Sequence, residues 1–329
     1  MRQKTLCKSW VVVINMISIA RYNESLKSQW DEVVRQSRNG TFLHLRDYMD
    51  YHHDRFVDHS LVARKGNDII ALLPACIDSD TLYSHRGLTF GGWIVPMRHF
   101  DVTTMLDVWQ QSTMYMKEQR ITRLVYKAVP PIYHRYPTEE DLYAIFRANG
   151  TLIESNISSV IDLDEPLLFD RGNKRNVNLA TRNNVSVGES QDWEKYWSIL
   201  QRLLMNKYGR KPVHSLDEIK LLQSRFPENI KLYTATLHDE LLAGVVMYYS
   251  GDQVAHCQYI SSTPRGRELK SLALLFDYLI KLAANIGFKY FDFGISNEDG
   301  GRYLNEGLVV QKCRMGGRGI VYNTYSINL

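Results

Sequence analysis

The sequence predicts an α/β (α+β) protein built from two tandem domains, each a mixed β-sheet flanked by helices. Its 329 residues, 44% of them hydrophobic, suffice for two medium-sized cores. The same order of elements also occurs twice: a β-hairpin, a further strand, an amphipathic helix and a closing strand. This repetition predicts a duplicated unit.

The first copy centres on a hairpin in residues 60–74, whose turn falls at Gly66-Asn67. This dipeptide suits the positive φ of tight hairpin turns. A helix over 25–37, capped by Asn23 or Ser25, leads into the hairpin. The elements after it are predicted as a strand at 81–83, a helix at 104–119 and a strand at 121–127.

The second copy has its hairpin in residues 231–245, with the turn at 238–240, and a leading helix over 193–208. The elements after it are predicted as a strand at 254–260, a helix at 268–286 and a strand at 288–293. Apolar residues at i, i+3 and i+4 give the 268–286 helix one face for a sheet. Because a strand-helix-strand crossover makes its two strands parallel, each sheet should be mixed.

The boundary between the copies is predicted near residue 166. Asp164-Glu-Pro and the polar run 171–176 interrupt the periodicity there. The predicted domains are therefore 17–165 and 166–329. Residues 1–16 contain an apolar run too short for a signal peptide, so we interpret them as a non-native-like or disordered extension, with Met16 as a plausible start.

Composition excludes several classes of protein. A net charge of +4 without Lys/Arg runs argues against DNA binding. The four cysteines lack CxxC spacing, and His52-His53 lacks the i, i+4 spacing of a helical zinc site, so no metal is predicted. No run approaches the ~18 apolar residues of a membrane-spanning helix. We expect a soluble, cytoplasmic protein, and peripheral contact with a membrane stays open.

Two motifs carry a family resemblance. Residues 258–270 read Gln-Tyr-Ile-Ser-Ser-Thr-Pro-Arg-Gly-Arg-Glu-Leu-Lys, a strand, loop and helix start that resembles a degenerate pyrophosphate loop of the GNAT acyltransferases. The resemblance implies that Arg265, Gly266 and Arg267 bind the phosphates of a donor. Phe291-Asp-Phe293, followed by Lys312 and Gly316-Gly317, is similar to the closing segment of the Fem peptidyltransferases. The Fem-like resemblance extends over residues 17–329.

This resemblance implies an acyl- or aminoacyltransferase. An amine of a cell-envelope precursor, from peptidoglycan or polysaccharide, would attack acyl-CoA or an aminoacyl-tRNA directly, so tRNA is a candidate partner. No tightly bound cofactor is implied. Two alternatives stay open: an acyl-CoA-dependent N-acyltransferase acting on a nucleotide sugar, and a non-catalytic protein that binds envelope precursors.

The candidate catalytic residues are Lys312, His256 and Glu298. Lys312 lies in the Fem-like motif, and a fixed cation suits a developing oxyanion. Histidine side chains in general titrate near neutral pH, which makes His256 a candidate general base, although a structural histidine is the commoner case. Glu298 follows the end of a predicted parallel strand, where sites of α/β proteins gather, but a turn-forming acid is as plausible an interpretation.

The candidate substrate-binding residues combine cations, aromatic rings and polar groups that suit an anionic or sugar-containing precursor. They are Arg86, Trp93, Lys127, Tyr133, Lys207, His214, Gln258, Tyr259 and Asn305. Strand alternation predicts His256 and Gln258 on one face and Tyr259 on the other. Ser215 lies three residues before Glu218, which predicts a capping box and excludes Ser215 as a nucleophile.

Overall fold

A computed structural model of the chain describes residues 16–251 and 253–329. The predicted N-terminal extension lies outside the described residues except for Met16. The chain divides into two compact units: unit 1 comprises residues up to Ser155 together with Tyr322–Leu329, and unit 2 comprises Asn156–Val321. The division therefore falls ten residues before the predicted boundary (166 − 156), within strand β8 (Thr151–Asp162), and the chain returns to unit 1 at its end.

Unit 1 contains two sheets. Strands β1, β3 and β4 form one, and β2, β5, β6, β7 and the end of β16 lie in order in the other. The strands are β1 (Ile17–Arg21), β2 (Val57–Asp58), β3 (Leu61–Lys65), β4 (Asp68–Leu73), β5 (Cys76–Asp78), β6 (Thr81–Tyr83), β7 (Arg123–Lys127) and β16 (Arg318–Asn328). The helices are α2 (Lys27–Gln36), α3 (Arg46–Met49), α4 (Val102–Glu118) and α5 (Glu140–Arg147). Helix α4 connects β6 to β7, which pair in parallel as expected for a crossover.

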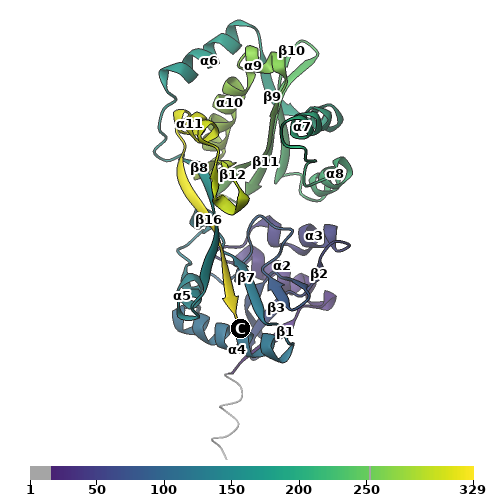
Figure 1. Cartoon of the computed structure of the whole chain (residues 1–329), viewed down its shortest axis with the longest axis vertical. Coiled ribbons are helices and arrows are strands. Elements are labelled where there is room, and N and C mark those ends of the chain that lie inside the picture. Colours follow the sequence, from purple (N-terminus) through teal and green to yellow (C-terminus); the bar gives the residue numbers. More distant parts are fainter. Residues whose placement is uncertain (1–15, 252) are drawn as a thin grey trace, which may run out of the picture. The chain divides into compact units, whose positions relative to one another are not determined.

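Unit 2 places strands β8, β13, β12, β11, β10 and β9 side by side in that order. The strands are β9 (Ser186–Ser190), β10 (Ile230–Leu237), β11 (Glu240–Ser250), β12 (Val254–Ser262), β13 (Tyr290–Ile295), β14 (Asn297–Glu298) and β15 (Tyr303–Leu304). The helices are α6 (Arg171–Arg182), α7 (Trp193–Tyr208), α8 (Leu216–Arg225), α9 (Pro264–Glu268), α10 (Ser271–Ile286) and α11 (Glu306–Arg314). Helices α6 and α10 lie on one face of the sheet, and α7 and α8 on the other (Figure 1).

Short 3₁₀ helices complete the chain: η1 (Glu24–Leu26), η2 (Phe42–His44), η3 (Asp50–His52), η4 (Pro131–Tyr133) and η5 (Asp299–Gly301). The repeated unit is confirmed, because each unit has a parallel strand pair joined by a helix, β6-α4-β7 and β12-α10-β13. The predicted hairpin turn at Gly66 is also confirmed, with φ of 62°.

The core of unit 2 explains why α10 forms. Its apolar stripe, including Leu275, Phe276 and Leu279, is buried against β10, β11 and β12. Each such side chain contributes about 1.5–3 kcal/mol when it leaves water. Left-handed residues flank the helix, Lys270 before it and Gly287 after it. The predicted helix 268–286 therefore begins only at Ser271, and Glu268 ends the separate helix α9.

The polar run 171–176, which we interpreted as an interruption of the periodicity between the two copies, is helical. It forms the start of α6, because the Asp170 carboxylate accepts a hydrogen bond from the Asn173 N–H at 2.6 Å and caps the helix. Ala180 is the one residue of this helix that is fully buried. A composition-based prediction misses such a helix because its apolar face is so narrow.

Candidate active site

A histidine and a buried carboxylate form the centre of the candidate site in unit 2. His256 Nδ1 lies 2.8 Å from Asp292 Oδ2, and the Asp292 side chain is fully buried. The other carboxylate oxygen, Oδ1, accepts hydrogen bonds from Ser158 Oγ and from the Gly294 N–H. These contacts hold Asp292 in place, so His256 donates its Nδ1 proton to a fixed acceptor and presents Nε2 as the basic nitrogen.

The pair lies where two parallel strands separate. Strands β12 and β13 pair at three positions, of which His256 and Asp292 form the last. Beyond it each strand changes register with its other neighbour, β12 with β11 and β13 with β8. The backbone beyond the pair is therefore released from the β12–β13 ladder, as bulges next to active sites commonly allow.

The irregularity in β12 corrects the predicted strand faces. Val246 pairs with Tyr259 and Met247 with Cys257, which leaves Gln258 as the extra residue. Tyr259 consequently lies on the same face as His256, not on the opposite face that simple alternation predicts. His214, which precedes α8, joins this face: its Nδ1 lies 2.6 Å from the Tyr259 hydroxyl, and both residues are buried.

Lys312 lies on α11 with only 3% of its surface exposed. Its Nζ donates to the carbonyl oxygens of Gly294 and Ile295, at 2.6 and 2.9 Å, and to Ser296 Oγ at 2.8 Å. Burial lowers the pKa of Lys312 to about 8, against the opposing attraction of Asp292. An ammonium group has three N–H donors, and here all three bind residues 294–296, the last two residues of β13 and the residue after it. The direct effect of Lys312 in this structure is to fix the end of β13.

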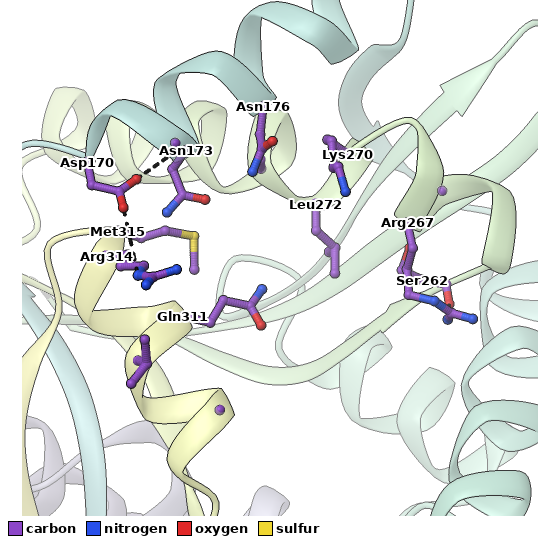
Figure 2. A pocket seen from close by; sticks show the side chains of 15 residues that line it. Asp170, Asn173, Asn176, Ser262, Arg267, Lys270, Leu272, Gln311, Arg314 and Met315 are labelled. Atoms are coloured by element: carbon purple, nitrogen blue, oxygen red, sulfur yellow. Dashed lines mark hydrogen bonds and ion pairs between the residues drawn. The ribbon is translucent and has the colours of Figure 1, made fainter.

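A cavity of about 390 Å³ opens between α6, α9–α10 and α11 (Figure 2). Arg267 and Lys270 line it from one side, and Arg314 lines it from α11, where it lies 3.9 Å from the Asp170 carboxylate. Neutral polar groups from Asn173, Asn176, Ser262 and Gln311 complete most of its polar lining. The cations suit a phosphate-containing ligand.

The predicted phosphate loop borders this cavity, but its backbone N–H groups have other partners. The Gly266 N–H donates to Thr263 Oγ1, and the N–H groups of Arg267 and Lys270 donate to backbone carbonyls within the segment. Gly266 is needed for packing, because a Cβ there would lie 2.1 Å from the Leu242 carbonyl oxygen. Arg265 is not among the lining residues, and it pairs with Glu240 at 2.9 Å. Phosphate binding would therefore depend on side chains.

The remaining residues predicted in unit 2 make contacts with groups other than His256 and Asp292. Glu298 lies on β14 and pairs with Tyr303 of β15. Asn305 caps α11 by accepting a hydrogen bond from the Leu308 N–H. Lys207 is exposed in the last turn of α7. The predicted capping box at Ser215 is confirmed, with reciprocal hydrogen bonds of 3.1 and 2.7 Å to Glu218.

The residues predicted in unit 1 occupy different environments. Arg86 forms an exposed ion pair with Asp78 at 2.6 Å. Trp93 and Tyr133 are buried in the interior of unit 1, so their rings cover little surface that a substrate could reach. Lys127 Nζ donates to the Leu88 carbonyl at 3.1 Å, and burial lowers its pKa.

Known proteins share part of this sequence and the fold of the chain. Residues 174–303 match the model of the acetyltransferase (GNAT) domain family. This match lies within unit 2 and assigns the GNAT domain to residues 174–303. No curated protein is similar to the sequence. An acetyltransferase domain of this family is what the resemblance predicted for the second half of the chain.

Several solved structures share the fold of the whole chain. FemX has a TM-score of 0.68 at 11% identity, covering 95% of this chain and 97% of its own. The C-terminal domain of a putative lysylphosphatidylglycerol synthetase from Agrobacterium fabrum has a TM-score of 0.60 at 12% identity, covering 93% and 92%. A tandem GNAT protein from the clavulanic acid biosynthesis pathway has a TM-score of 0.50 at 9% identity, covering 95% and 98%. The Fem-like tandem GNAT fold is therefore shown.

Sequence reasoning missed two residues of the GNAT-domain site, Asp292 and Ser158. Asp292 could have been found, because a carboxylate between Phe291 and Phe293 in a buried strand requires a partner. Ser158 carried no such signal, since β8 approaches β13 only in the folded chain. Within residues 16–251 and 253–329, no helix is long and apolar enough to cross a membrane.

Proposed function

We propose that the GNAT domain transfers an acyl or aminoacyl group from an activated carbonyl to an amine, with His256 as the general base. The observation that carries this proposal is the 2.8 Å contact of His256 with Asp292 at the end of the β12–β13 ladder. A histidine that is oriented by a carboxylate through Nδ1 can accept an amine proton at Nε2.

The reaction needs no covalent enzyme intermediate. The amine nitrogen forms a bond to the carbonyl carbon while His256 accepts its proton, and the C–S bond of a thioester or the C–O bond of an ester then breaks. The proton passes to the departing sulfur or oxygen. Asp292 stabilises the imidazolium that forms in between, because its carboxylate is buried and held by two further donors.

Lys312 acts as a positioning residue in this proposal. Its three hydrogen bonds fix residues 294–296, which form the end of β13, the strand that carries Asp292, and the residue after it. The Gly294 N–H is one of the donors that hold the Asp292 carboxylate. Loss of the ammonium group would therefore disturb His256 through residues 294–296 and Asp292. Lys312 would act in this way without contacting the substrate.

The donor is proposed to bind in the cavity beside α9 and α10. Lys270 and Arg267 supply positive charge there, and a volume of about 390 Å³ lies within the usual range of small-ligand sites. Acyl-CoA is the donor that this chemistry favours, since its phosphates match the cations and its thioester carries the acyl group. An aminoacyl-tRNA is the second candidate donor.

The acceptor is proposed to be an amine of a cell-envelope precursor. Support comes from the fold shared with FemX and with a protein named a putative lysylphosphatidylglycerol synthetase. A nucleotide sugar amine is the alternative acceptor. A non-catalytic protein that only binds envelope precursors would not need the oriented histidine.

The base is tested by acyl transfer with His256→Asn, with the exposed turn residue His238→Asn as the matched control. The purified chain is incubated with labelled acyl-CoA or aminoacyl-tRNA and a panel of amine precursors. Transfer should fall by about 10²–10⁴-fold in the first variant and persist in the second. Equal activity in both would reject His256 as the base.

The donor site is tested by thermal shift with coenzyme A. Saturable stabilisation is expected, about 2.7 kcal/mol at a hundredfold excess over Kd. Arg267→Gln with Lys270→Gln should weaken it, whereas the exposed Lys289→Gln should not. Stabilisation by aminoacyl-tRNA and not by coenzyme A would assign the second donor.

A further inference from the structure

An exposed segment at the start of unit 2 combines apolar and basic side chains. Leu167 and Leu168 are 48% and 77% exposed. Helix α6 follows directly and carries four exposed cations, Arg171, Lys174, Arg175 and Arg182. We refer to Leu167, Leu168 and these four cations as the α6 surface.

The backbone that carries the two leucines is held in place. The Leu167 carbonyl lies against Gly316, where a Cβ would come within 2.4 Å of its oxygen. The Asp170 N–H donates to the Arg314 carbonyl at 2.9 Å. Between them, Phe169 packs against the core of unit 2. Because both neighbours of this short stretch are anchored, the leucine side chains cannot turn inward without breaking these contacts.

The cations form one stripe on the helix. Arg171, Arg175 and Arg182 are separated by four and seven residues, so they point in nearly the same direction, with Lys174 beside them. Ala180, at the opposite side, is buried, and α6 packs against α10 there. The stripe therefore faces away from the body of unit 2.

The charges on this stripe are not neutralised. Among the residues that the structure describes, no acidic side chain lies within 4.0 Å of a charged nitrogen of the four cations. The carboxylate of Asp170, next to the helix, is occupied with the helix cap and with Arg314. Like charges at i, i+4, such as Arg171 and Arg175, destabilise a helix. The stripe therefore lowers the stability of α6, and binding to an anionic partner would offset that loss.

We propose that the α6 surface docks on an anionic lipid membrane. Cations on the exposed face of a helix, next to exposed apolar side chains, suit a lipid interface, with the cations at the headgroups and the leucines below them. A nucleic acid would engage the cations and leave the leucines without a role. The proposal does not depend on the proposed function, although docking would bring the GNAT domain to acceptors held at a membrane.

The test is sedimentation of the full chain with vesicles. Vesicles of phosphatidylcholine alone are compared with an equimolar mixture of phosphatidylcholine and phosphatidylglycerol, at low and high salt. Binding is expected to the anionic vesicles only and should weaken as salt rises. Absence of binding to anionic vesicles would overturn the proposal.

Two variants locate the contact. Arg175→Gln with Arg182→Gln should lower the affinity for anionic vesicles about 25-fold, from a loss of roughly fivefold for each cation near the surface. The matched control, Arg202→Gln with Arg210→Gln, removes two exposed cations elsewhere in unit 2 and should bind normally. Equal losses in the two pairs would show a nonspecific charge effect and reject the α6 surface.

Replacing the two leucines distinguishes binding to a membrane from binding to RNA. Leu167→Ser with Leu168→Ser should abolish vesicle binding, and both side chains are exposed, so the fold should be retained, as circular dichroism would check. If this variant instead binds vesicles as the wild type does, the lipid assignment fails. The stripe would instead be assigned to nucleic acid if the wild type bound RNA and not vesicles, and if RNA binding were lost in the cation variant but kept in the leucine variant.

Discussion

Replacement of Asp292 by asparagine tests the candidate site most directly, because it keeps the shape of the side chain. The Gly294 N–H and Ser158 Oγ both donate to Oδ1 of the carboxylate. The amide oxygen of Asp292→Asn should keep these donors, which turns the NH₂ group toward His256 Nδ1. His256 Nδ1 must then accept a hydrogen bond, so the imidazole proton moves to Nε2. Nε2 no longer has a free lone pair with which to accept the proton of an amine.

The magnitudes separate a catalytic effect from a structural one. A charge-assisted hydrogen bond contributes about 1.5–3 kcal/mol and a neutral one about 0.5–1.5 kcal/mol, so each contact of Asp292 weakens by about 1 kcal/mol. Relief of the buried charge opposes this loss. We expect the free energy of unfolding to change by less than about 2 kcal/mol, whereas the rate of acyl transfer should fall by about 10²–10⁴-fold.

The assay has two parts. The ¹⁵N chemical shifts of the His256 imidazole report its tautomer without any substrate, and transfer kinetics report kcat and KM separately. The change should appear in kcat. Asp299→Asn, at an exposed position with φ of 52°, is the matched control. An unchanged His256 tautomer in Asp292→Asn, together with wild-type kcat, would refute the assignment of the base.

Three further predictions concern stability. Burial lowers the pKa of Lys312 to about 8, below its unfolded value of 10.5, so the unfolded chain binds more protons between these values. The free energy of unfolding of the wild type relative to Lys312→Met should therefore rise by about 3 kcal/mol from pH 8 to 10.5 in denaturant titrations. Burial raises the pKa of Asp141 from 3.8 to about 6. The stabilisation by Asp141 is present below pH 3.8 and is lost as pH rises through 6. Across that window the free energy of unfolding of the wild type should fall by about 3 kcal/mol relative to Asp141→Asn. A difference between the two proteins that does not change with pH would contradict the assignment. Gly266→Ala should destabilise the protein by about 1–3 kcal/mol through its clash with the Leu242 carbonyl. Gly307→Ala should not, because a Cβ there would make only an ordinary van der Waals contact with the Asn305 side-chain oxygen at 3.9 Å; equal melting temperatures would argue against the packing.

Local signals in the sequence were sufficient for much of the fold. The turn at Gly66, the capping box at Ser215 and the apolar stripe of α10 each depend on residues within a few positions of one another. The repeated order of elements then predicted two tandem domains. The N-cap at Asp170 was equally local, but the polar composition of α6 obscured it.

The tertiary structure alone decided the chemistry of the site. His256 and Asp292 meet because β12 and β13 are adjacent, and Ser158 joins them from β8. One extra residue at Gln258 moves Tyr259 to the histidine face, since side chains alternate along a strand and a single insertion reverses every later position. Strand register and strand order are set by contacts between distant segments, so no pattern along one strand could have predicted that these three residues meet.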